Sequence, residues 1–231
     1  MKAPCDQYIS DLRRIMENSA DKENAYFMRK YMRNLFPFFG IRSPERKQIF
    51  RQFIKNESIP SLADLEKFLK SLYAQPEREF HYFAMELLDK YSIKINEKGV
   101  ELFEYLIVNN SWWDTVDFIA VNSLSKYFKL NPGLIRPVTA IWIESGNTWL
   151  QRSCVLFQLK YRKNTDLDLL YSFIFKLKDS DEFFIQKAIG WVLREYSKIN
   201  PEEVIRFTGN MVLKPLSKRE ALRIVIKKGY S

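Results

Sequence analysis

The sequence predicts an all-helical protein made of a repeated pair of helices. A charged residue followed by tyrosine recurs along the chain, and the successive tyrosines lie 36, 34, 35 and 34 residues apart. The copies are Lys90-Tyr91, Lys126-Tyr127, Lys160-Tyr161, Glu195-Tyr196 and a degenerate Gly229-Tyr230. No window shows the strict apolar alternation of a half-buried strand. Glycines and prolines lie mainly between helical patterns, where helices end and begin.

The repeat length indicates the architecture. A period of about 35 residues in a helical chain is typical of a solenoid of stacked helix pairs. Tetratricopeptide repeats share this period, but their Trp, Leu-Gly and Tyr pattern is absent, so a HEAT-like (ARM-type) stack fits better. We therefore expect an α-α superhelix of antiparallel helix pairs with a basic concave face, forming one domain over residues 1–231.

Prolines and one polar position define the repeat more closely. Pro132, Pro201 and Pro215 each follow a polar residue at a predicted helix start, where proline costs no needed hydrogen bond. The residue ten positions before each tyrosine is polar in all five copies: His81, Asp117, Gln151, Gln186 and Glu220. We expect this row to line the exposed inner face of the superhelix.

Composition favours an anionic partner and excludes several kinds of site. Lys and Arg outnumber Asp and Glu by 37 to 28, which gives a formal charge of +9. This excess favours a polyanionic partner, and the alternative interpretation is a basic surface with no specific partner. With two cysteines and one histidine, we expect no metal, no cofactor and no catalytic triad, and His81 is interpreted as a packing or surface residue. The absence of a long apolar segment predicts a cytoplasmic protein that does not enter a membrane.

The segment from about Glu182 to Lys198 predicts a helix with two different faces. Its apolar side should pack in the core, and consists of Ile185, Ala188, Ile189, Val192, Leu193 and Tyr196. The opposite side carries Lys187, Trp191, Arg194 and Lys198. An indole between cations and far from the apolar stripe favours ligand contact, unless a neighbouring helix covers it.

A second helix is predicted to begin near residue 111. Ser111 is a plausible N-cap, and Asp114 would serve the positive helix N-terminus. Trp113 and Asp117 are four residues apart and share a face. A carboxylate beside an aromatic wall can stabilise developing positive charge, although paired tryptophans are more often part of a core.

Six stretches, spread in order over nearly the whole chain, resemble one family. They are residues 40–46 (GIRSPER), 76–80 (PEREF), 111–117 (SWWDTVD), 149–152 (WLQR), 183–196 (FFIQKAIGWVLREY) and 215–221 (PLSKREA). Together they resemble the AlkD-type DNA alkylation repair glycosylases of the HEAT-like DNA glycosylase superfamily.

The resemblance implies an activity and residue roles. A protein of this kind is a monofunctional alkylpurine DNA N-glycosylase, acting as a monomer on double-stranded DNA in base-excision repair. It removes cationic N3- and N7-alkylated purines without trapping a flipped base. By this similarity Asp117 is the catalytic carboxylate, with Trp113 and Trp191 as aromatic walls. The implied DNA contacts are Arg152, Arg194, Tyr31, Lys187, Ser43, Lys47, Lys218 and Arg219.

Two other functions stay open at this point. One is a non-catalytic relative that binds distorted or branched DNA through the same basic face; loss of Asp117 or of either tryptophan would have favoured it. The other is a HEAT-like scaffold for a partner protein, whose binding would be insensitive to salt. DNA binding, in contrast, falls steeply with salt because it releases counterions.

Overall fold

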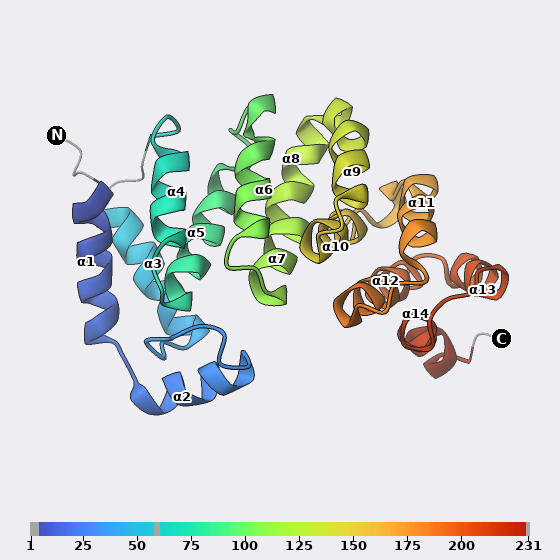
Figure 1. Cartoon of the computed structure of the whole chain (residues 1–231), viewed down its shortest axis with the longest axis horizontal. Helices are drawn as coiled ribbons and strands as arrows, with labels where there is room; N and C mark the ends of the chain where they lie inside the picture. The colour runs from blue at the N-terminus through green and yellow to red at the C-terminus, as the bar shows by residue number, and fades with distance from the viewer. Residues whose placement is uncertain (1–4, 58–60, 230–231) are drawn as a thin grey trace. The chain divides into compact units, whose positions relative to one another are not determined.

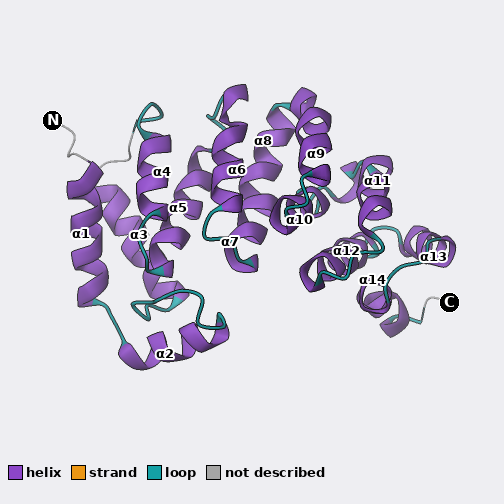
Figure 2. Ribbon diagram, viewed as in Figure 1, coloured by secondary structure: helices purple, strands orange, loops and turns teal. Residues whose placement is uncertain are grey.

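A computed structural model describes residues 5–57 and 61–229. Within these ranges the helices are joined by loops and no strand is formed (Figure 2), which confirms the all-helical prediction. The chain divides into two compact units, with the boundary between Ile95 and Asn96. We call them unit 1 and unit 2 and describe each by itself. The single domain over residues 1–231 and its concave basic face stay predictions.

The described residues of unit 1 form five α-helices. They are α1 (Cys5–Asn18), α2 (Lys22–Tyr31), α3 (Ser43–Glu57), α4 (Leu65–Tyr73) and α5 (Arg78–Tyr91). Helix α1 packs against α3 and α4, and α4 packs against α5 (Figure 1). Their apolar faces meet in a core that includes Leu12, Leu69 and Phe83. Helix α2 differs from the others because none of its residues is buried.

The loop between α2 and α3 is tied to the start of α5. The carboxylate of Glu79 accepts hydrogen bonds from the backbone N–H groups of Phe39, Gly40 and Ile41, at 3.1, 2.9 and 3.2 Å. Burial nevertheless raises the pKa of Glu79, while the three donors oppose that shift. Gly40 has a φ of +91°, which a residue with a side chain rarely adopts. This one carboxylate therefore fixes the path of the chain between α2 and α3.

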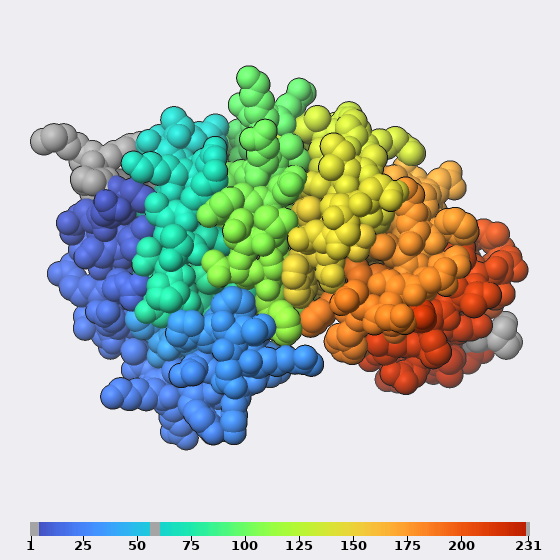
Figure 3. Space-filling model, viewed as in Figure 1, coloured from blue at the N-terminus to red at the C-terminus, as the bar shows by residue number. Residues whose placement is uncertain are grey.

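Unit 2 continues the pairwise stacking. Its α-helices are α6 (Val100–Val108), α7 (Trp113–Phe118), α8 (Ser125–Leu130), α9 (Ile135–Glu144), α10 (Thr148–Leu156), α11 (Leu167–Leu177), α12 (Phe183–Tyr196), α13 (Pro201–Asn210) and α14 (Pro215–Lys227). Helix α10 packs on α7 and α12, and α12 packs on α14, while α9 and α13 pack on their partners α10 and α14. In Figure 3 the colours of unit 2 follow one another in bands, because contacts are made between segments close in sequence. This is the packing of a helical solenoid.

The repeated tyrosines connect neighbouring helix pairs. The Tyr127 hydroxyl donates to the backbone oxygens of Asn96 and Glu97, at 3.0 and 2.8 Å. The Tyr161 hydroxyl donates to the oxygen of Ser125 at 2.9 Å. Each bond joins residues that lie roughly one repeat apart in the sequence. Tyr127 and Tyr161 therefore each link their own helix pair to the preceding one. Tyr230, the last predicted copy, lies outside the described residues.

The expectation for the polar row was wrong in part. His81 is only 1% exposed and lies in the core of unit 1. Its Nε2–H donates to the oxygen of Gln75 at 2.9 Å, which leaves Nδ1 to accept from Arg78 at 3.1 Å. Gln151 and Gln186 are half-buried and donate to Ile143 and Ser180 oxygens, at 3.0 and 3.1 Å. Three members of the row therefore hold the end or the turn of the preceding helix, and this explains their polarity without an exposed face.

Candidate active site

Four helices of unit 2 form one cavity of about 370 Å³. Helices α7, α10, α12 and α14, which pack in succession, each contribute to it. The lining side chains are Trp113, Asp117, Arg152, Phe183, Phe184, Lys187, Trp191, Arg194 and Glu220. The structure thus brings together the predicted carboxylate, both predicted tryptophans and three of the predicted DNA-binding cations.

Helix α7 begins differently from the prediction. Its N-cap is Trp112, with extended φ and ψ of −157° and 162°, and no side chain caps it. Ser111, the predicted cap, donates its hydroxyl proton to the oxygen of Ile107 at 2.6 Å. The serine therefore closes the end of α6, and the N-cap position of α7 falls one residue later, at Trp112. Trp113 still opens the helix and Asp117 lies one turn later, on the same side.

The helix widens directly after Asp117. A π-helical turn, η2 (Ile119–Leu124), joins α7 to α8, and backbone conformation at both joints stays helical. The Asn122 side chain donates to the oxygen of Phe118 at 2.9 Å, and its own oxygen accepts from Lys160 at 2.6 Å. Such turns occur often at functional sites. Nothing in the sequence pattern indicated it.

Asp117 and Arg152 form a buried, bidentate ion pair. The Arg152 Nε and Nη2 atoms donate to the two oxygens of Asp117 at 2.7 and 2.8 Å. The side chains are 15% exposed for Asp117 and 5% for Arg152. Burial raises the pKa of the Asp117 carboxyl, and the hydrogen bonds from Arg152 act against that rise. The arginine therefore keeps a buried carboxylate charged.

This pairing changes the expectation for Arg152. The resemblance implied that Arg152 contacts DNA, but three of its five N–H groups point to protein acceptors, since Nη1 donates to the oxygen of Phe184. Without ligand, Arg152 orients Asp117. Its contact with phosphate stays a prediction, and would use the two remaining N–H groups.

Two aromatic side chains pack against Phe184, which lines the cavity. The Trp112 and Trp149 rings each lie 5.0 Å from the ring of Phe184, between centroids. Phe184 also lines the cavity and carries the carbonyl that accepts from Arg152. Trp112 packs against these rings and does not line the cavity, as is common for one of two paired tryptophans, whereas Trp113 and Trp191 do line it. The two indoles that the resemblance implied are those that a ligand in the cavity can reach.

The cations of α12 are held by a second carboxylate. Glu220 of α14 accepts from Lys187 Nζ at 2.9 Å and from Arg194 Nη1. The hydrogen bond from Lys187 is the main reason why the pKa of Glu220 lies below its usual range. Lys218 and Arg219 are exposed on the same helix, outside the cavity lining. The sequence placed Glu220 only in the polar row and did not indicate these partners.

The placement of Glu220 depends on a glycine. A Cβ at Gly190 would lie 2.5 Å from the Cβ of Glu220 and 3.0 Å from the backbone oxygen of Ser217. We expect Gly190→Ala to move α14 away from α12 and to destabilise the fold by about 1–3 kcal/mol. Urea denaturation followed by circular dichroism measures this. Gly209→Ala, at a helical glycine with nothing within 4 Å of a new Cβ, should instead be neutral or slightly stabilising; equal losses in both variants would contradict the argument.

Comparisons with known proteins show which family the chain belongs to. The family model of the DNA alkylation repair enzyme matches residues 12–225. The chain belongs to the DNA alkylation repair enzyme family. A solved structure described as a predicted DNA alkylation repair enzyme from Enterococcus faecalis is 32% identical, with a TM-score of 0.84. The match covers 90% of this chain and 97% of that one. No curated protein sequence matches.

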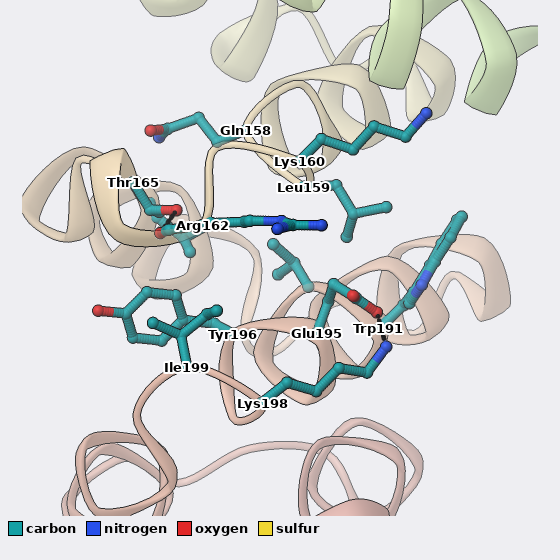
Figure 4. A pocket seen from close by; sticks show the side chains of 12 residues that line it. Gln158, Leu159, Lys160, Arg162, Thr165, Trp191, Glu195, Tyr196, Lys198 and Ile199 are labelled. Carbon is teal, nitrogen blue, oxygen red and sulfur yellow. Dashed lines mark hydrogen bonds and ion pairs between the residues drawn. The ribbon is translucent and has the colours of Figure 1, made fainter.

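A larger cavity lies on the other side of Trp191 in this DNA alkylation repair enzyme. It measures about 720 Å³ and is lined by the segment between α10 and α11, by α11 and α12 themselves, and by the turn after α12. Lys160, Arg162 and Lys198 contribute positive charge, and Figure 4 shows the Arg162 guanidinium extending toward the middle of the cavity. The backbone of Arg162 has a φ of +55°, a costly conformation that points to a constrained position. Trp191 therefore borders two cavities with basic linings.

The remaining predicted residues lie in unit 1. Tyr31 ends α2 and is 70% exposed, while Ser43 begins α3. Both line a cavity of about 300 Å³ within that unit, together with Met28, Arg46 and Tyr82. Lys47 is exposed on α3 and does not line that cavity. The structure thus places Tyr31 and Ser43 together, and their roles toward DNA stay predictions.

The described residues contain neither a metal-binding cluster nor a membrane-spanning helix. No group of three or more His, Cys, Asp or Glu side chains there could hold a metal ion. No helix in residues 5–57 and 61–229 is long and apolar enough to span a membrane.

Proposed function

We propose that this DNA alkylation repair enzyme is an alkylpurine DNA N-glycosylase that removes cationic N3- and N7-alkylated purines. The observation that carries the proposal is the Asp117 carboxylate, held charged by Arg152 in a cavity lined by Trp113 and Trp191. An ionised carboxylate between electron-rich rings is suited to stabilise a cation. Such a cation forms on the sugar when a glycosidic bond breaks.

The substrate class follows from the groups in the cavity. An alkylated purine already carries a positive charge, so it leaves with the electron pair of the C1′–N bond and needs no acid. The cavity lining supplies no histidine. Water then adds to C1′ and loses a proton, which yields the free base and an abasic site. Asp117 would stabilise the sugar cation and orient this water through carboxylate lone pairs that Arg152 leaves open.

Contacts with DNA would come from the cations around the cavity. Lys187 and Arg194 lie beside Trp191, and Lys218 and Arg219 are exposed on α14. Cations at such positions bind phosphates and set the register of the duplex. The second cavity beyond Trp191, with Lys160 and Arg162, would extend this surface along the same strand. The formal charge of +9 agrees with a polyanionic partner.

The test is single-turnover release of base from duplex DNA that contains one 7-methylguanine. We expect release well above spontaneous depurination, and no release of a neutral modified base such as uracil or hypoxanthine from a matched duplex. Release of the neutral bases would overturn the proposal that leaving-group charge replaces acid catalysis. No release of either kind would overturn the glycosylase function.

One observation favours a second candidate, a protein that binds distorted or branched DNA without cleaving it. Without DNA, both oxygens of Asp117 are engaged by Arg152, so part of the negative charge is neutralised. If DNA did not loosen this pair, the carboxylate would be a poor stabiliser of a sugar cation. Salt-dependent binding to a branched duplex with no base release would establish this alternative.

The rate should fall in acid. A protonated Asp117 has no negative charge to offer, and burial raises its pKa above the ordinary aspartate value of 3.8. We therefore expect enzymatic release to fall as the pH decreases, and to do so at higher pH than it would for an exposed aspartate. Single-turnover rates from about pH 4 to about pH 8 test this. The no-enzyme rate is subtracted at each pH, and a flat profile would contradict the role of Asp117.

A further inference from the structure

The cavity of about 370 Å³ contains two carboxylates that have different cation partners. Asp117 is paired with Arg152 alone among the cavity cations, whereas Glu220 takes both Lys187 and Arg194. These are all the charged groups of the lining, three cations and two carboxylates. The division matters because any cation that Glu220 did not hold would face Asp117 in the same small space.

The position of Glu220 is built into the fold. Its side chain is 12% exposed, and its Cβ fills the space left by the missing side chain of Gly190. The Ser217 hydroxyl, one turn earlier on α14, donates to the oxygen of Gln186 on α12 at 3.0 Å. Gly190 lies between Lys187 and Arg194 on α12, so the close approach of the two helices places one carboxylate between both cations.

The repeat supports a special role for this residue. Glu220 occupies the same position in its helix pair as Asp117 does, ten residues before the repeated tyrosine. The other members of the row, His81, Gln151 and Gln186, donate to backbone oxygens. Only the two copies that line this cavity carry a carboxylate, and both bind cations there.

We infer that Glu220 is a positioning residue that holds Lys187 and Arg194 away from Asp117, and so keeps Asp117 available to the sugar cation. This inference rests on the proposed function. The physical reason is that a cation released near the reacting sugar opposes the charge that forms there, and also competes with Arg152 for the carboxylate. The same released cation would bind DNA phosphate more strongly.

The inference predicts opposite changes in binding and chemistry. Glu220→Gln keeps the shape that fits against Gly190 but removes the charge. We expect it to bind undamaged duplex several-fold more tightly, with a log–log salt dependence steeper by about one. At saturating DNA, the single-turnover release of 7-methylguanine should be roughly tenfold slower.

Two further variants separate this role from net charge and from folding. Glu202→Gln removes the same charge from an exposed residue of α13 that does not line the cavity, and should change neither quantity more than slightly. Lys187→Gln in the Glu220→Gln background removes one released cation, and should restore part of the rate. In the wild-type background Lys187→Gln should not raise the rate.

The outcomes are distinguishable. An active wild type whose rate is unchanged by Glu220→Gln would overturn this inference alone. Weaker binding together with a slower rate would also overturn it, because that pattern indicates a displaced α14. A wild type that releases no alkylated base would overturn the proposed function and this inference with it.

Discussion

Asp117→Asn is expected to reduce single-turnover release of 7-methylguanine by at least about 100-fold. The amide keeps the size of the carboxylate but carries no charge, so it cannot stabilise the sugar cation. It also leaves the guanidinium of Arg152, which is 5% exposed, without its counter-ion. Loss of one partner of a buried pair lowers stability, so circular dichroism and a thermal melt must show that the variant is folded at the assay temperature.

Asp114→Asn is the matched control for this prediction. Asp114 lies in the first turn of the same helix and does not line the cavity. Its substitution removes the same charge from α7, and the rate should stay within a few-fold of the wild type. If the two variants lost activity equally, the effect would come from the helix and not from a carboxylate at the reacting sugar.

Gly40→Ala is expected to have the largest effect on stability, about 3–4 kcal/mol of unfolding free energy. A Cβ at this position would lie 2.0 Å from the backbone oxygen of Asp21 and 2.6 Å from the backbone nitrogen of Ala25. Both atoms belong to the start of α2, so no flexible side chain can yield. Relief would require the loop to leave Glu79, and would displace Tyr31 and Ser43, which flank it. Urea denaturation followed by circular dichroism measures the loss.

Gly146→Ala separates the steric effect from backbone strain. Gly146 also has a positive φ, +69°, but a Cβ there meets nothing within 4 Å. We expect it to lose only the cost of the left-handed conformation, about 1–2 kcal/mol. Equal losses at Gly40 and Gly146 would mean that the contact with Asp21 contributes nothing.

The helices and their faces could be predicted because the evidence for them is local. Apolar residues at helical spacing placed α12 at Phe183–Tyr196, within two residues of the predicted ends. Pro132, Pro201 and Pro215 each begin a helical segment as expected. Trp113 and Asp117 share a face because four residues make about one turn. Short-range rules were sufficient for these features.

The pairings across helices could not be predicted in the same way. Arg152 lies 35 residues from Asp117 and Glu220 lies 33 from Lys187, and a periodic pattern does not say which charges will meet. The row that contains His81 shows the same limit, since a polar side chain that is hydrogen-bonded inside the protein gives the same pattern as an exposed one. Ser111 shows that even a local rule fails when the helix begins one residue later than expected, since the N-cap position falls at Trp112.

The environment of Cys154 affects how the protein would survive the agents that damage DNA. This thiol lies inside α10, is 1% exposed and approaches the oxygen of Thr139 at 3.8 Å. Burial raises its pKa, so it carries almost no thiolate, the form that reacts with alkylating agents. A methyl group on this sulfur would have to fit into a closely packed interior. Cys154 lies two residues after Arg152 in α10, and Arg152 orients Asp117. The protein meets the same electrophiles as its proposed substrate, and burial keeps the Cys154 thiol out of their reach.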